Sequence, residues 1–217
     1  MTQATLLPWL LAAALCASCV STKELADPTI LVHSPSGTEL GVSTEYGTVF
    51  LGRFARGGEI DVTAWFGDGP SLESSVVEPL GAGLFTAETE IRLPAVRLAF
   101  HQPQNGAPVI VRGRNGANVW SLEAAVRTDP RVDGILLRPT GGLKGSEEQI
   151  GAGVFIGEEL EDYRLLGLVS GRIELVDAAG AVTEYVTVVG PTDLWRIVAH
   201  GRDLQRKTRW VYREDIL

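Results

Sequence analysis

Cysteine is nearly absent from this chain of 217 residues, whose only two cysteines are Cys16 and Cys19. The remainder of the chain therefore has no thiol to offer for an internal disulfide. Histidine is scarce too, with His33, His101 and His200 far apart in the sequence. Because zinc and iron sites need clustered His, Cys or carboxylate ligands, we predict no metal site and no cofactor.

Positive charge is also in short supply, with 19 basic residues against 27 acidic ones and a net charge of −8. An acidic surface repels polyanions on average, which argues against a nucleic-acid partner. The exception is a basic tail at residues 202–213, which also contains Trp210 and Tyr212. Such a tail can contact anionic lipid or an acidic partner, or it can pair with the domain's own carboxylates.

No apolar run is long enough to span a bilayer as a helix, which needs about 20 residues. The run Leu6–Leu15 has instead the length of a signal-peptide core. The following Ala17-Ser18-Cys19 resembles the lipobox of bacterial lipoproteins, although Cys16 stands where Leu is usual and no Lys or Arg precedes the run.

The lipobox resemblance implies a signal peptide at residues 1–18, an acylated Cys19 and a lipidated tether at residues 19–28. Several acyl chains on one cysteine anchor a protein firmly, so the membrane is the expected partner and the cell envelope the expected location. Val20 after the cysteine resembles the pattern sorted to the outer membrane in cells with two membranes. The alternative is an ordinary secretory signal, which gives a periplasmic or secreted protein.

Glycine is abundant, with 25 residues, and short runs rich in Val, Ile and Thr alternate with turn residues. This spacing of strand and turn signals predicts an all-β protein. The segment Glu59–Trp65 alternates apolar and polar residues as a half-buried strand does. Pro191 and Thr192 predict one helix, from Thr192 to about His200.

Several segments resemble trypsin-like serine proteases when taken in order. They are the strand "GAPVIVRG" at 106–113, the glycine-containing turn and strands "QIGAGVFIGEELEDYRLLGLVSGRIEL" at 149–175, and the proline-led helix "VVGPTDLWRI" at 188–197. The resemblance implies two packed antiparallel barrels with a short C-terminal helix. The first barrel would span residues 29–105, and the second would span 106–217 with the helix and the basic tail. A single β sandwich is the alternative.

The catalytic residues of that family are not matched. A serine triad needs a hydroxyl nucleophile, a histidine to take its proton and a carboxylate to orient the histidine. The aligned nucleophile position holds Ile150, and no histidine follows a first-barrel strand in the family's pattern. We therefore predict a candidate cleft made of Ile150, Gly151, Ser170 and Gly171, without catalytic residues.

We expect a non-catalytic, lipid-anchored envelope protein that binds a peptide or protein ligand. One alternative is an active peptidase in another register, with Ser146 or Ser170 as its nucleophile. The other is a purely structural envelope lipoprotein.

Overall fold

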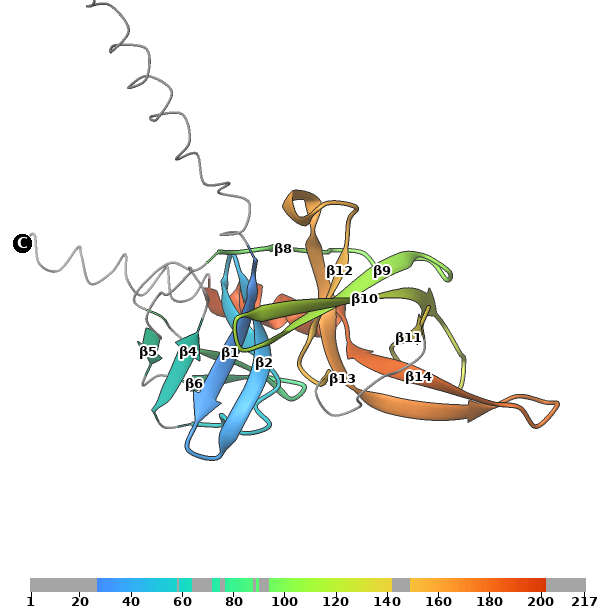
Figure 1. Ribbon diagram of the computed structural model, residues 1–217, viewed down its shortest axis with the longest axis horizontal. Helices are drawn as coiled ribbons and strands as arrows, with labels where there is room; N and C mark the ends of the chain where they lie inside the picture. The colour runs from blue at the N-terminus through green and yellow to red at the C-terminus, as the bar shows by residue number, and fades with distance from the viewer. Residues whose placement is uncertain are drawn as a thin grey trace, which may run out of the picture.

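The computed structural model describes residues 27–57, 59–63, 72–74, 77–87, 89, 94–141 and 149–201. The expected signal peptide, Cys19, Ser146 and the basic tail lie outside these residues. Within the described part of the chain, no helix is both long and apolar enough to cross a membrane. Figure 1 shows two curled sheets beside each other.

The first sheet has seven strands in the order β5-β4-β1-β2-β3-β7-β6. Its edge strands β5 and β6 are separated in the chain only by residues 75 and 76, so the sheet has to curl back on itself to bring its two edges together. The strands are β1 (Thr29–Ser34), β2 (Gly37–Thr44), β3 (Gly47–Phe50), β4 (Ile60–Thr63), β5 (Leu72–Ser74), β6 (Val77–Gly81) and β7 (Leu84–Ala87).

The second sheet has the order β12-β9-β10-β11-β14-β13-β8, and β12 also pairs with β13. That additional pairing closes six of its strands into a barrel, which leaves no open sheet edge around the ring. The strands are β8 (Arg97–Leu98), β9 (Pro108–Asn115), β10 (Asn118–Arg127), β11 (Ile135–Pro139), β12 (Gly153–Ile156), β13 (Arg164–Val176) and β14 (Val182–Val189).

The two barrels share one topology. We take β5 and β6 as two parts of one strand and number the six strands of each barrel along the chain. Neighbouring strands around each barrel are then the first, second, third, sixth, fifth and fourth. The expected all-β fold of two antiparallel barrels is thus confirmed, and the single sandwich is set aside.

The hairpin of β13 and β14 extends well beyond the second barrel (Figure 1). It ends in a turn with Gly180 at φ +86°, a backbone conformation that glycine adopts without steric cost. Val176 and Val182 pair directly beside this turn and are both largely exposed. The pairing of β13 with β14 shifts at Ser170, which forms a β-bulge.

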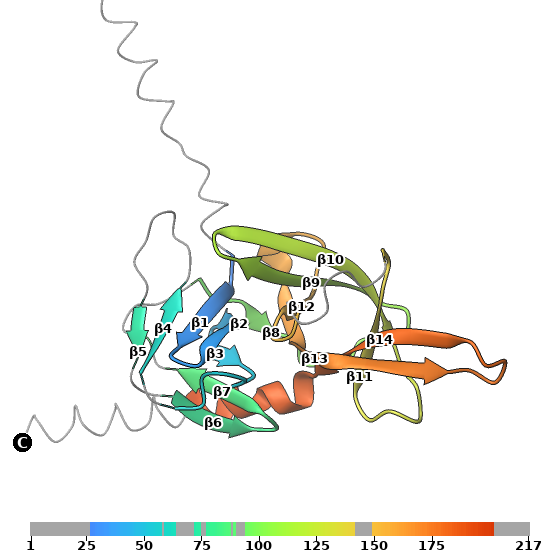
Figure 2. The same ribbon diagram turned by 60° about the horizontal axis from the view of Figure 1, so that its bottom comes forward.

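Residues 191–201 are helical, beginning at Pro191, where a missing N–H costs no hydrogen bond. The helix buries Leu194, Ile197 and Val198 in a cluster that also contains residues of both barrels. It lies beside β6 and β7 of the first barrel (Figure 2) although it follows the last strand of the second. The C-terminal helix therefore joins the two barrels.

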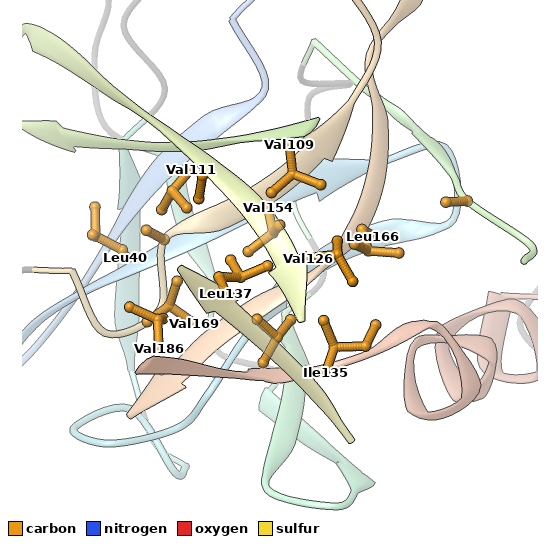
Figure 3. Packing of buried hydrophobic residues seen from close by; sticks show 14 of the residues in the cluster. Leu40, Val109, Val111, Val126, Ile135, Leu137, Val154, Leu166, Val169 and Val186 are labelled. Carbon is orange, nitrogen blue, oxygen red and sulfur yellow. The ribbon is translucent and has the colours of Figure 1, made fainter. Parts of the chain in front are cut away.

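The largest buried cluster belongs mainly to the second barrel and includes Val111, Val154 and Val169 (Figure 3). Leu31 and Leu40 of the first barrel also pack into it. The interior of the first barrel is a separate apolar cluster: Ile30, Val32, Phe50, Ala55, Ile60, Val62 and Ala87. The barrels are consequently joined by shared apolar packing as well as by the helix.

Candidate functional site

The turn that leads into β12 places Ile150 beside β13. The Gly151 N–H donates to the Val169 carbonyl over 2.8 Å, and the Val169 N–H donates to the Ala152 carbonyl over 2.9 Å. The turn is closed by the Ala152 N–H, which donates to the Gln149 carbonyl over 3.0 Å. These bonds bring both parts of the candidate cleft together, because residues 170–171 directly follow Val169.

Gly151 also lies against the first barrel. It is buried at φ +91°, and a Cβ atom there would stand 2.7 Å from the Leu40 carbonyl oxygen in β2. Only glycine fits both this backbone conformation and this close approach. Ile150, its neighbour in the turn, is half-buried. The turn therefore presents an aliphatic side chain where the protease resemblance implies a nucleophile.

Ser170 is exposed at the bulge of β13, and its Oγ lies 3.0 Å from Thr187 Oγ1 in β14. Both residues line a pocket of about 420 Å³ together with Asp133 and Asp193. The contact that Ser170 makes is thus with a hydroxyl group, which cannot act as a general base at neutral pH.

The histidines are distributed over three places in the fold. His33 in β1 has its Nδ1 2.9 Å from Thr38 Oγ1, across the β1–β2 pairing. His101 is exposed in the segment between the barrels. His200 Nδ1 lies 3.3 Å from the Glu78 carboxylate, between the C-terminal helix and β6. Each described contact of a histidine is therefore with a residue outside the candidate cleft.

Glu39 in β2, next to Leu40, is a buried carboxylate that belongs to no recognisable sequence motif. Its two oxygens accept the backbone N–H groups of Arg53, Phe54 and Ala55 at 2.9, 3.1 and 2.8 Å. Its side chain faces the loop that follows β3, and the residue is only 4 % exposed. Glu39 thereby fixes the conformation of that loop.

A second buried charge, Asp27, ties the start of the described chain to the second barrel. Its carboxylate accepts Arg112 Nε at 2.7 Å and the Thr29 N–H at 2.9 Å, with Arg114 Nη2 3.8 Å away. Burial lowers the pKa of Arg114, and the neighbouring Asp27 carboxylate opposes that shift. Residues 27 and 28, which the sequence analysis places in the tether, are both buried.

The main chain of β13 is open on one side near the candidate cleft. Its first residues lie between β12 and β8, whereas residues 170–176 pair only with β14. Among the described residues, the opposite edge of 170–176 has no strand beside it. An edge of this kind can accept a further strand.

No group of three or more His, Cys, Asp or Glu side chains in the described ranges is arranged to hold a metal ion. A short 3-10 helix, Leu160–Asp162, lies at the tip of the β12–β13 hairpin and lines a second pocket.

The sequence matches no known protein family and no curated protein. Solved structures give a different result, and those most similar include serine proteases. Rv3671c from M. tuberculosis H37Rv, in its inactive form, is 19% identical with a TM-score of 0.55, over 92% of this chain and 97% of that one. The serine protease of a human pathogenic astrovirus is 13% identical with a TM-score of 0.53, over 76% of this chain and 91% of that one.

The serine endoprotease from Yersinia pestis is 14% identical with a TM-score of 0.52, and the match covers 80% of this chain and 61% of that one. These likenesses show that the chain has the trypsin-like two-barrel fold. They do not assign it an activity, because the same fold can host different functions.

Proposed function

We propose that this chain is a non-catalytic, lipid-anchored envelope protein that uses its trypsin-like scaffold to bind an extended peptide. The observation that supports it best is Ile150, which lies half-buried in the turn beside β13. An aliphatic side chain cannot attack a carbonyl group, whereas it can pack against a bound chain.

The open edge of β13 supports the peptide as ligand. An extended peptide can add to residues 170–176 as a strand, with its main chain hydrogen-bonded to β13 and alternate side chains facing the surface. Ile150 and Ser170 lie at the start of this edge, since the Gly151–Val169 hydrogen bond holds the turn against β13. The same site would then select apolar peptide side chains near Ile150.

The absence of catalysis is tested with a fluorophosphonate probe on the folded full-length protein. We expect no labelling, and stoichiometric labelling of a single serine would refute the non-catalytic assignment. Ser170→Ala serves as the control that identifies the labelled residue in that case. This measurement also tests Ser146 as an alternative nucleophile, because peptide mapping locates the label.

Introducing a hydroxyl group at position 150 tests whether a general base is available to activate it. Ile150→Ser is expected to fold and to remain inactive towards peptide and ester substrates, since His33 and His200 contact Thr38 and Glu78 and His101 lies in the segment between the barrels. Turnover by Ile150→Ser above that of the parent would show that a base stands within reach.

Peptide binding is tested by amide hydrogen exchange with a peptide selected from a random library. The expected result is slower exchange within residues 170–176 when the peptide is bound. Protection at another surface, with none in this segment, would contradict strand addition to β13.

The lipid anchor is tested separately by membrane fractionation. Cys19→Ala should release the protein from the membrane fraction, whereas Cys16→Ala should leave it there. Equal behaviour of the two variants would count against acylation of Cys19.

A further inference from the structure

A pocket of about 320 Å³ lies between the segment linking the barrels and the tip of the β12–β13 hairpin. Its lining includes Arg97, Glu161, Asp162 and Arg164, and it shares no residue with the candidate cleft. Pro28 also lines it, directly after the Asp27 contact that ties the start of the described chain to β9. Figure 1 shows β8, the hairpin tip and the start of β1 on the same side of the molecule.

Two arginines that line this pocket stand at neighbouring positions of two paired strands. Arg97 in β8 and Arg164 in β13 are register partners in a parallel pairing, and both are exposed. Neither has an ion pair or a side-chain hydrogen bond with another residue of the described chain, whereas Arg112, Arg131 and Arg172 all do. Neighbouring strands are about 4.8 Å apart, so the two positive charges repel each other.

An anion bound between the two guanidinium groups would remove this repulsion. Guanidinium groups present paired N–H donors that match the oxygens of phosphate, so a phosphate group is the ligand they suit best. Such a pair of cations is also unusual in a protein whose net charge is −8.

A carboxylate in the same pocket narrows the choice of ligand. Asp162 would repel a ligand that is only anionic, but it attracts a primary ammonium group. A ligand that combines a phosphate with an ammonium group satisfies both halves of the pocket. The headgroup of an ethanolamine phospholipid has this chemistry.

The position of the pocket agrees with a lipid surface. If Cys19 carries the lipid, seven residues, 20–26, separate it from Asp27. The eight steps of extended chain from Cys19 to Asp27 span at most about 28 Å, which keeps Pro28 and the pocket close to the bilayer. We propose that Arg97 and Arg164, with Asp162, bind the zwitterionic headgroup of an ethanolamine phospholipid and orient the domain on the membrane. This inference rests on the proposed lipid anchor for its location.

The test uses the full-length Cys19→Ala protein, so that vesicle binding does not depend on acylation. Sedimentation is compared for vesicles of phosphatidylcholine alone, with added phosphatidylethanolamine and with added phosphatidylglycerol. We expect the strongest binding with phosphatidylethanolamine, whose ammonium group carries hydrogen-bond donors. Equal binding to all three compositions, or no binding to any, would overturn the proposal.

Variants then assign the binding to the pocket. Arg97→Ala with Arg164→Ala should reduce binding to phosphatidylethanolamine vesicles at least tenfold, and Arg138→Ala, an exposed arginine of β11 outside the pocket, should not. Asp162→Asn should shift the preference towards phosphatidylglycerol. An unchanged affinity of the double arginine variant would overturn the assignment.

Soluble competitors separate a lipid surface from other sources of the same chemistry. O-phosphoethanolamine and inorganic phosphate should displace the vesicles only at much higher concentration than the lipid itself, because they lack the bilayer. If either compound, or an aspartate-rich peptide, binds as tightly as the vesicles do, then that compound and not the lipid is the ligand of the pocket. Fractionation of the acylated protein tests the anchor independently, so failure of the anchor and failure of the pocket give different results.

Discussion

Removing the Glu39 carboxylate should destabilise the fold considerably, and the structure allows the size of the effect to be worked out. Three backbone N–H groups donate to this carboxylate at 2.8–3.1 Å. Hydrogen bonds to a charged group contribute about 1.5–3 kcal/mol each. The full sum is an upper limit, because water can reach the N–H groups of Arg53 and Phe54, which are partly or well exposed.

Ala55 is completely buried, so its N–H group would remain without an acceptor in Glu39→Ala. We therefore expect Glu39→Ala to lower the free energy of unfolding by about 3–4 kcal/mol. Glu39→Gln keeps one carbonyl oxygen as acceptor and should lose roughly half as much. For a chain of this size, the Tm of the alanine variant should fall by roughly 10 °C.

Calorimetry and urea unfolding measure the global effect, and limited trypsin digestion measures the local one. Cleavage after Arg53 and Arg56 should become faster in Glu39→Ala, because the carboxylate holds this loop in place. Glu123→Ala, which removes an exposed carboxylate from β10, should change the free energy of unfolding by less than about 0.5 kcal/mol. If Glu39→Ala matches Glu123→Ala in both assays, the loop does not depend on the carboxylate and the reasoning is wrong.

Three further outcomes follow from the geometry. Gly151→Ala should lower the free energy of unfolding by about 3 kcal/mol, because the new Cβ would stand 2.7 Å from a backbone oxygen. Gly116, at φ +59° with nothing within 4 Å of a Cβ, is the control, and Gly116→Ala should lower it by only about 1 kcal/mol. Urea unfolding measures both changes. The side-chain hydrogen bond from Arg131 lowers the pKa of Asp129 to about 2. The contribution of the Asp129 carboxylate to stability is therefore complete above pH about 3.9 and is lost as the pH falls through about 2. A carboxyl NMR titration should show that midpoint, and Arg131→Ala should return it towards about 3.9; an unchanged midpoint would contradict the assignment. Asp27→Ala removes the carboxylate beside the buried Arg114 and the partly buried Arg112, and it should lower the free energy of unfolding by about 3–5 kcal/mol. A loss below about 1 kcal/mol would show that this cluster is not coupled to folding.

The positions of many strands could be predicted from the sequence, because short runs rich in Val, Ile and Thr alternate with turn residues. The arrangement of the strands in two barrels was implied only by the resemblance to trypsin-like proteases. Glu59–Trp65 was expected as a strand, and β4 covers its centre. The apolar runs Leu165–Val169 and Ile173–Val176 look like two separate strands in the sequence, but the structure joins them in one strand, β13, with a bulge at Ser170. Gly171, beside Ser170, suggests a turn between two strands, because glycine is common in β-bulges as well as in turns.

The site was predictable only where local sequence determines it. Ile150 and Gly151 could be placed before β12 because the turn and its strand are adjacent in the chain. Glu39 and Asp27 could not be identified, since their partners stand 14–16 and 85 residues away and a charged residue in a strand normally faces solvent. The pairing of Arg97 with Arg164 was equally inaccessible, because it depends on a parallel contact between distant strands.

The C-terminal helix makes the order of synthesis matter for how this protein matures. Leu194 and Ile197 close an apolar surface to which Val42 and Val49 of the first barrel contribute. Those valines leave the ribosome about 150 residues before the helix does. Contacts so far apart in sequence form slowly, and the unfinished surface is prone to aggregation until they do. A chain exported in an unfolded state would therefore complete the interface between its barrels only after its last segment has emerged. In the interval, a chaperone that shields the first barrel would have a defined apolar surface to protect.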